Sequence, residues 1–173
     1  GMAATPDGSP RRIESLTQSH DRRSLVSGQP LLDDFLRHRA GQYDRRDVGR
    51  TYVLVAAGDL RVRGYYTLAA GAMGFSAIPD EWSKRLPPHH IPTVHLGRLA
   101  VDKAVQGMGL GGDLLFHGLQ TAVRVSEEIG VYAVDVFAID ENAKSFYRRF
   151  GFLQLEDDPF HLFLPVKLVR QLM

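Results

Sequence analysis

Between residues 94 and 129 an apolar run, a cluster of glycines and an amphipathic segment follow one another directly. The run over residues 94–101, which is mostly apolar, predicts a β-strand. Four glycines within residues 107–112 predict a tight turn, because glycine adopts backbone angles that other residues avoid. Apolar residues at helical spacing then predict a helix as far as Ile129. A strand, a glycine-rich loop and a helix in this order favour an α/β fold.

The glycine-rich loop has features of an anion-binding site. N–H groups at the start of a helix have no partners within the helix and converge on a negative charge. Glycines also let the backbone approach a phosphate, because they have no Cβ atom. Residues 111–113 (Gly-Gly-Asp) differ from the end of a P-loop, and the glycine spacing fits the dinucleotide fingerprint poorly. A pyrophosphate-binding loop and a plain strand-to-helix turn both remain open at this point.

The first half of the chain predicts a helix followed by an antiparallel hairpin. The helix begins at Pro30 and is about ten residues long. Its apolar stripe consists of Leu31, Leu32, Phe35 and Leu36. Residues 40–50 are polar and predict a loop. The β-branched and aromatic runs over residues 51–57 and 62–70 predict the two strands of the hairpin.

The second half predicts alternating strands and helices. Residues 131–139 are apolar on both alternating faces apart from Asp135, which favours a central strand in a parallel pairing. Residues 140–149 predict a short helix that begins with Asp140 as its cap. The last two strands are expected over residues 152–155 and 160–166. This pattern predicts a mixed α/β sheet.

Composition limits the domain count and the chemistry. A chain of 173 residues predicts one domain, expected over residues 16–173, after a flexible N-terminus over residues 1–15 that starts with a tag remnant. The chain contains no cysteine, which excludes disulfides, thiolate metal sites and a cysteine nucleophile. No signal peptide and no apolar run of about 18 residues occur. We therefore expect a cytoplasmic protein that has no membrane span.

Two motifs together resemble the GNAT family of N-acetyltransferases. Residues 106–111, Gln-x-x-Gly-x-Gly, resemble the family's Arg/Gln-x-x-Gly-x-Gly/Ala signature. Residues 143–152, Ala-x-x-Phe-Tyr-x-x-x-Gly-Phe, resemble its second signature. The resemblance covers about residues 50–165 and implies a GNAT fold. That fold is a mixed, mostly antiparallel central sheet flanked by helices, with splayed central parallel strands.

The resemblance implies acetyl-CoA as co-substrate, no metal and a set of site residues. The expected CoA-binding residues are Leu99, Ala100, Val101, Gln106, Gly107, Met108, Gly109, Leu110, Gly111 and Gly112. Tyr147 is the expected general acid, since a phenol with a pKa of about 10 can protonate a departing thiolate whose thiol has a pKa of about 8.5. Its alternative role is that of a core aromatic residue. Met108 departs from the family, which often has Lys or Arg there, so we expect weaker CoA binding.

Two residues of the strand over residues 94–101, His95 and Arg98, each have two possible roles. It carries no carboxylate, where many GNAT enzymes place a general base, but it does carry His95. His95 is either a partly buried strand histidine or a base. Arg98 either pairs with Asp135 on the neighbouring strand or faces the acceptor or the CoA, since a buried cation is costly without a partner. We expect Arg98 to bind substrate.

An α-amine is a suitable acceptor for a site whose strand carries no carboxylate base. Its pKa of about 8 leaves a fraction neutral at pH 7, whereas a lysine side chain with a pKa of about 10.4 needs more help with losing its proton.

Six further segments of the chain resemble, in the same order, segments of the acetyltransferase toxins of type II toxin–antitoxin modules. These are residues 20–23, 27–28, 32–36, 50–52, 64–68 and 96–102.

This second resemblance implies aminoacyl-tRNA as the acceptor, whose acetylation blocks translation. It also implies a ribbon-helix-helix antitoxin as partner, and a homodimer. Paired cations would then contact RNA phosphates, although the alternative is a set of solvated faces. These pairs are Arg11-Arg12, Arg22-Arg23, Arg45-Arg46, Lys84-Arg85 and Arg148-Arg149. A protein N-terminus or a small amine remains an alternative acceptor, and a non-catalytic CoA-binding module remains an alternative function.

Overall fold

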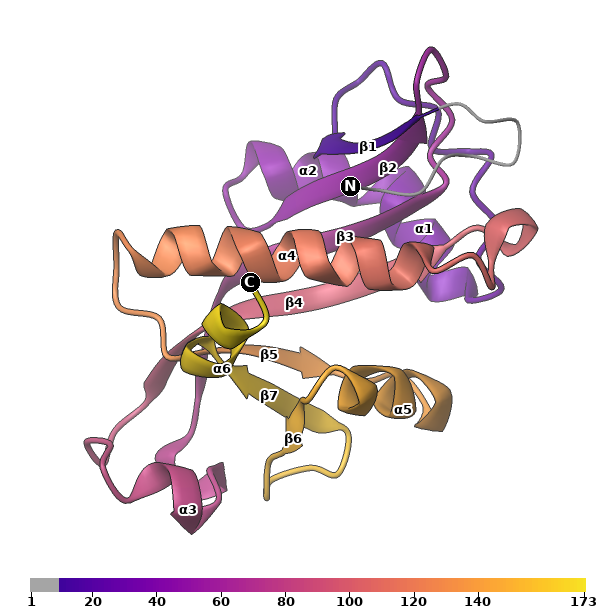
Figure 1. Cartoon of the computed structure of the whole chain (residues 1–173). Coiled ribbons are helices and arrows are strands. Elements are labelled where there is room, and N and C mark those ends of the chain that lie inside the picture. Colours follow the sequence, from indigo (N-terminus) through magenta and orange to yellow (C-terminus); the bar gives the residue numbers. More distant parts are fainter. Residues whose placement is uncertain (1–9) are drawn as a thin grey trace. The chain divides into compact units, whose positions relative to one another are not determined.

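The computed structural model describes residues 10–173 (Figure 1). Its strands form a seven-stranded sheet in the order β1-β2-β3-β4-β5-β7-β6. The strands are β1 (Arg11–Ser15), β2 (Arg50–Ala56), β3 (Gly64–Met73), β4 (Ile91–Val101), β5 (Ala133–Phe137), β6 (Leu153–Gln154) and β7 (His161–Pro165). The α-helices are α1 (Pro30–His38), α2 (Ala40–Arg45), α3 (Asp80–Ser83), α4 (Leu110–Ser126), α5 (Glu141–Arg149) and α6 (Val166–Gln171), and η1 (Phe75–Ala77) and η2 (Lys103–Val105) are 3-10 helices. The parallel pairing of β4 with β5 confirms the predicted mixed sheet.

Contacts along the chain divide it into two compact units. The first unit comprises residues 1–69 and 98–118, and the second comprises residues 70–97 and 119–173. Three elements, β3, β4 and α4, contribute residues to both units. That residues 16–173 form one domain stays a prediction.

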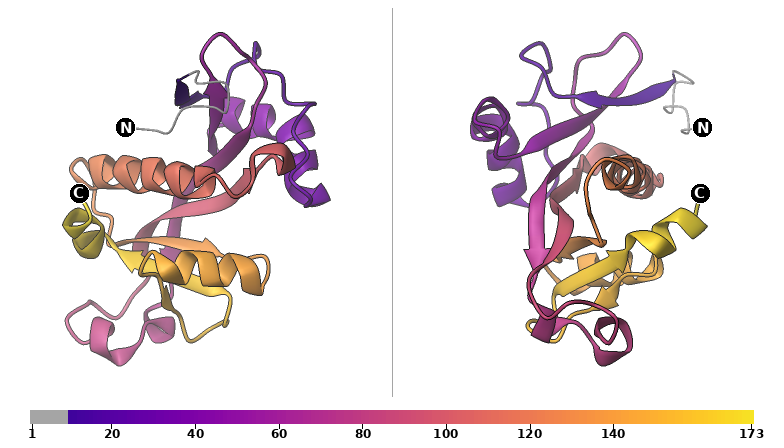
Figure 2. Two further views of the ribbon diagram at one scale, coloured as in Figure 1. Left: turned by 45° about the vertical axis from the view of Figure 1, so that its right-hand side comes forward. Right: turned by 90° about the vertical axis from the view of Figure 1, so that its left-hand side faces the viewer.

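In the first unit, β3 carries helices on both of its faces. Neighbouring residues of a strand point to opposite faces. Tyr65 points toward α1, where its hydroxyl donates to the carbonyl of Leu32 at 2.6 Å. Gly64 faces α4, because a Cβ atom there would lie 2.9 Å from Leu114. The right-hand view of Figure 2 shows α1 and α2 on one side of β2.

The helix predicted from Pro30 is confirmed as α1, with one correction to its buried stripe. Leu32, Phe35 and Leu36 are buried, but Leu31 is 86% exposed. The buried positions follow the spacing i, i+3 and i+4, and Leu31 lies outside this narrow stripe. The prediction of a loop over residues 40–50 was wrong, since α2 fills its first half.

The helix α2 forms because a few of its side chains pack despite its polar composition. Ala40 is fully buried, and the ring of Tyr43 meets that of Phe35 edge-on, with centroids 5.0 Å apart. Ala40 and Tyr43 are three residues apart and share one face of α2. Tertiary packing therefore decides the structure of this segment.

The strand β1 lies inside the segment expected to be flexible. It pairs antiparallel with β2 from Arg11 opposite Ala56 to Ser15 opposite Tyr52. Residues 11–15 of the expected flexible segment are thus a paired strand, whose ladder hydrogen bonds connect this polar run to β2. The tag remnant and the rest of the expected flexible tip, residues 1–9, lie outside the described residues.

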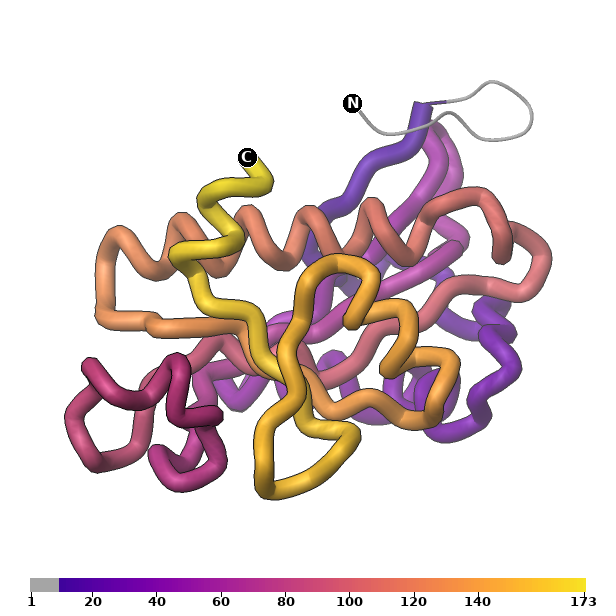
Figure 3. Tube along the Cα trace, turned by 60° about the horizontal axis from the view of Figure 1, so that its bottom comes forward, coloured from indigo at the N-terminus to yellow at the C-terminus, as the bar shows by residue number. Residues whose placement is uncertain are grey.

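In the second unit, β5 is a central strand, as predicted. It pairs in parallel with β4 and antiparallel with β7, and Val134 and Val136 are fully buried. Asp140 caps α5, as predicted, by accepting a hydrogen bond from the N–H of Ala143 at 2.8 Å. Figure 3 traces the chain from β5 through α5 and back along β7 into α6. None of the helices within residues 10–173 is long and apolar enough to cross a membrane.

Candidate functional site

The glycine-rich loop connects β4 to α4 through η2, and Asp102 organises its first turn. One carboxylate oxygen of Asp102 accepts a hydrogen bond from the N–H of Ala104 at 2.8 Å. The other accepts from the N–H of Val26 at 3.1 Å. One buried carboxylate thus fixes both the end of β4 and the segment that precedes α1.

Gln106 holds the loop against the strand end. Its side-chain amide donates to the carbonyl of Val101 and to the carbonyl of Ser27, both at 2.9 Å. Both donors of this amide are therefore used inside the protein. This explains why the position takes a long side chain with several N–H donors, and it gives Gln106 a bracing role in the loop.

Gly107 and Gly109 adopt the left-handed backbone region, with φ angles of 83° and 79°. A Cβ atom at either residue would meet no atom of residues 10–173 within 4 Å. The backbone conformation, rather than crowding by protein atoms, therefore requires glycine at these two positions. These angles turn the chain sharply into α4.

The start of α4 presents N–H groups outside the helical ladder. The backbone N–H of Asp113 donates to the carbonyl of Gly109 at 3.2 Å. The N–H groups of Leu110, Gly111 and Gly112 belong to the preceding turn, which has no acceptors within the helix. Leu110 is buried and anchors this turn. A helix of 17 residues adds partial positive charge at this end, so the turn can hold an anion.

The last residues of β4 differ in their surroundings. Ala100 is buried, whereas Leu99 and Val101 are partly exposed. The guanidinium carbon of Arg98 lies 3.6 Å from the ring centroid of Phe35 and 5.4 Å from that of Tyr43. These cation–π contacts stabilise the arginine without a carboxylate. The alternative pairing of Arg98 with Asp135 was wrong, since Asp135 binds other residues.

Asp135 is the centre of a buried polar network that was not predicted from the sequence. Its carboxylate accepts from Thr93 Oγ1 at 2.7 Å and contacts His161 Nε2 at 2.8 Å and His95 Nδ1 at 3.1 Å. The sequence signal was present, because Asp135 interrupts an otherwise apolar strand. His95 is partly buried, with 30% of its side chain exposed.

The hydrogen bonds of this network favour the charged forms of Asp135 and His161. Burial by itself raises the pKa of Asp135, but hydrogen bonds from His161, His95 and Thr93 lower it to about 2. Burial by itself lowers the pKa of His161, and its bonds to Asp135 and Asp157 outweigh this and raise it. The network therefore favours an ionised carboxylate at Asp135 and the protonated form of the His161 imidazole.

Tyr147 lies on α5 between two other aromatic rings. Its side chain is buried, and its ring centroid lies 5.2 Å from that of Phe146 and 5.4 Å from that of Phe152. Burial raises the pKa of the phenol well above its usual value. Tyr147 is therefore neutral at pH 7 and can donate a proton or a hydrogen bond.

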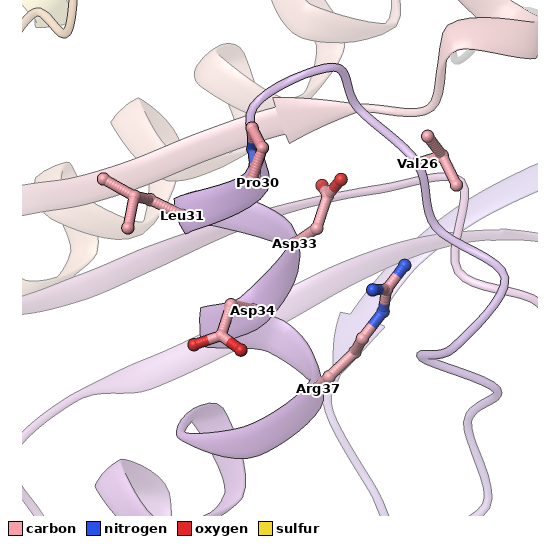
Figure 4. A pocket seen from close by; sticks show the side chains of 6 residues that line it. All are labelled: Val26, Pro30, Leu31, Asp33, Asp34 and Arg37. Atoms are coloured by element: carbon pink, nitrogen blue, oxygen red, sulfur yellow. The ribbon is translucent and has the colours of Figure 1, made fainter.

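Two other features of the first unit have local roles. A hollow beside α1 is lined by Val26, Pro30, Leu31, Asp33, Asp34 and Arg37 (Figure 4). Asp33 accepts from the Ser27 hydroxyl at 2.6 Å, and Arg37 donates to the Leu25 carbonyl at 2.8 Å. Both side chains therefore brace the segment before α1. No cluster of metal-binding residues was found in the part of the chain that the structure describes.

Comparison with known proteins identifies relatives over most of the chain. Residues 49–154 match the acetyltransferase (GNAT) domain model. A tRNA-acetylating toxin of Mycobacterium tuberculosis is 37% identical over 163 residues, which are 94% of this chain and 95% of the relative.

Two solved structures extend the comparison. AtaT complexed with acetyl-methionyl-tRNAfMet superposes with a TM-score of 0.89 and 32% identity, covering 94% of this chain and 99% of AtaT. A mutant AtaT toxin bound to acetyl-CoA and to the C-terminus of the antitoxin AtaR has a TM-score of 0.80 and 30% identity. That match covers 94% of this chain and 97% of the mutant toxin.

Proposed function

This chain belongs to the acetyltransferase (GNAT) family, and from that premise we propose that it transfers the acetyl group of acetyl-CoA to the α-amine of an aminoacyl-tRNA. The observation that carries the proposal is 37% identity to a tRNA-acetylating toxin over 94% of the chain. Acetylation of that amine prevents it from forming a peptide bond. The protein would therefore act as a toxin that blocks translation.

The glycine-rich loop supplies the groups that would hold the CoA pyrophosphate. The amides of Leu110, Gly111 and Gly112 start a long helix, and the positive φ angles of Gly107 and Gly109 direct the backbone into it. Residues 99–101 of β4 would offer backbone groups to the pantetheine arm. Bound acetyl-CoA brings a thioester, whose carbonyl carbon is open to attack by an amine.

Tyr147 would act when the thioester breaks. The acceptor nitrogen forms a bond to the acetyl carbon, the C–S bond breaks, and sulfur leaves with the electron pair. Tyr147 donates its proton to that sulfur and regains one from solvent, while the acceptor nitrogen loses a proton to water. Burial raises the pKa of Tyr147, so the phenol is protonated before the thiolate forms, and a thiol desolvated beside it also has a raised pKa, which favours transfer of the proton to sulfur.

The acceptor amine would need little help from a base. The Nδ1 atom of His95 is engaged with Asp135, and the proposal assigns no proton transfer to His95. An α-amine with a pKa of about 8 supplies its own neutral fraction at pH 7. Arg98, held over the ring of Phe35, would bind the substrate.

Partners follow from the same proposal. AtaT is seen with the C-terminus of its antitoxin AtaR, and we propose a ribbon-helix-helix antitoxin for this chain as well. We also propose that it forms a homodimer and works in the cytoplasm, where charged tRNA is found. Arginine pairs such as Arg22-Arg23 would contact RNA phosphates.

The test is acetyl transfer from labelled acetyl-CoA to a full set of charged tRNAs. The proposal expects label on the amino acid of at least one tRNA species. Peptides with free N-termini and small amines serve as competing acceptors. Transfer to these in the absence of RNA, with no label on any tRNA, would support the alternative acceptors. Binding of acetyl-CoA without transfer to any acceptor would support a non-catalytic module.

A further inference from the structure

Arg11, the first residue of β1, carries a buried guanidinium group that lacks part of its hydrogen bonding. The residue is 7% exposed, and its Nη1 atom has no hydrogen-bond partner among residues 10–173. Its Nη2 atom lies 4.0 Å from the sulfur of Met108, and a thioether is a weak acceptor. A strong acceptor is therefore missing beside the glycine-rich loop.

The neighbouring arginine shows how unusual this environment is. Arg12 is exposed and its Nε lies 2.9 Å from a carboxylate oxygen of Glu14. Because alternate residues of a strand point to opposite faces, β1 sends Arg12 outward and Arg11 into the protein. Burying a charged group without partners is unfavourable. Nothing in the pairing of β1 with β2 requires an arginine side chain at this position.

We propose that Arg11 binds the pyrophosphate of acetyl-CoA beside the N–H groups that start α4. This inference rests on the proposed function. Phosphate oxygens are strong acceptors, and the planar guanidinium can offer them two parallel N–H bonds. Arg11 then supplies from β1 the cation that the loop lacks at Met108.

Met108 leaves room for this binding. Its side chain is 38% exposed, and methionine has three rotatable bonds. Its contact with Arg11 is weak, so the sulfur can turn away when a phosphate arrives. The Nη2 atom of Arg11 then exchanges a thioether for a charged oxygen.

The proposal predicts opposite effects on stability and on binding. Arg11→Met removes a buried, partly unpaired charge and keeps an unbranched apolar side chain. The protein without ligand should melt at the same temperature or higher, whereas acetyl-CoA should bind more weakly. An arginine that only supports the fold would show the reverse, with a lower melting temperature and an unchanged Kd.

Isothermal titration with acetyl-CoA on the full chain tests this. We expect the Kd of Arg11→Met to rise about tenfold or more, as for loss of a hydrogen bond between charged groups. The matched control Arg12→Met should stay within about twofold of wild type, since exposed ion pairs contribute little. Adding Met108→Arg to Arg11→Met should restore part of the affinity.

Two further results separate the possible failures. Dephospho-CoA keeps the pyrophosphate and lacks the 3′-phosphate, so the loss in Arg11→Met must persist with it. A loss that vanishes with dephospho-CoA, or an unchanged Kd for acetyl-CoA, overturns the assignment of Arg11 while the proposed function stands. Failure of the wild-type protein to bind acetyl-CoA overturns the proposed function itself, and this inference with it.

Discussion

The Nε2 atom of His161 lies 2.8 Å from the Oδ2 atom of Asp135, and the two side chains are 6% and 4% exposed. The two residues lie on paired strands, β7 and β5. The other ring nitrogen of His161 lies 3.0 Å from a carboxylate oxygen of Asp157. Two carboxylates facing the two nitrogens of one imidazole stabilise the form that carries both protons. Asp135 and the protonated form of His161 therefore make a buried ion pair in the second unit.

Removing the imidazole should destabilise the protein. His161→Gln leaves the buried Asp135 carboxylate without its main charged partner, and we expect the free energy of unfolding to fall by about 3 kcal/mol. Urea unfolding at pH 6 measures this. His38→Gln is a matched control, since the His38 side chain is 70% exposed and its loss should cost less than about 0.5 kcal/mol. Equal stability of the two variants would contradict the buried ion pair.

The same pair predicts how stability depends on pH. The pKa of His161 is raised in the folded protein, so its contribution is complete below its unfolded pKa of about 6.5 and is lost as pH rises through the folded pKa. Asp135 behaves oppositely, and its contribution is lost only as pH falls toward about 2. We expect the difference in unfolding free energy between wild type and His161→Gln to shrink above pH 6.5. A difference that grows with pH would contradict the protonated imidazole.

The hydroxyl of Tyr147 should matter for turnover more than for folding. Tyr147→Phe keeps the ring contacts with Phe146 and Phe152 and removes the proposed acid. We expect kcat to fall at least about 100-fold, with little change in the Kd for acetyl-CoA. Single-turnover acetyl transfer and acetyl-CoA titration separate the two effects.

Tyr65→Phe is the control for Tyr147→Phe. Tyr65 is also buried, and its hydroxyl donates to the Leu32 carbonyl. Its loss should lower the free energy of unfolding by about 1 kcal/mol and leave kcat nearly unchanged. Similar kcat values for Tyr147→Phe and Tyr65→Phe would remove the acid role.

Elements with a strong local signal could be predicted from the sequence. The glycine-rich loop ends β4 and starts α4 at the expected place, because positive φ angles at Gly107 and Gly109 demand glycine. The start of α5 followed from a single cap at Asp140. The roles of the loop residues, of Arg98 and of Tyr147 stay predictions.

Features that depend on distant partners could not be predicted in the same way. The polar strand β1 forms because β2 offers it a free edge, and α2 forms because Tyr43 reaches Phe35. The partners Asp135 and His161 are 26 positions apart, and strand register alone brings them together. Arg98 carries no pattern that would distinguish a carboxylate partner from the ring of Phe35.

The left-handed backbone conformation of Gly109 should be required for binding acetyl-CoA. Gly109 has a φ angle of 79°, where an alanine is strained by about 1–2 kcal/mol. Gly109→Ala can relieve this strain by rotating the loop, since no atom in the described part of the chain lies within 4 Å of the added Cβ atom. That rotation turns the amides at the start of α4 away from a bound pyrophosphate. We therefore expect the KM for acetyl-CoA to rise at least about tenfold.

Gly58→Ala separates this effect from strain alone. Gly58 has a φ angle of 74° and equally open surroundings, but it lies in the turn after β2 and outside the glycine-rich loop. Both variants should lose about 1 kcal/mol of stability, measured by urea unfolding, and Gly58→Ala should keep the wild-type KM. If both variants change KM alike, general destabilisation rather than amide direction accounts for the loss. A changed KM in Gly109→Ala alone supports the loop as the anion site, because the two substitutions differ in position and share their backbone strain.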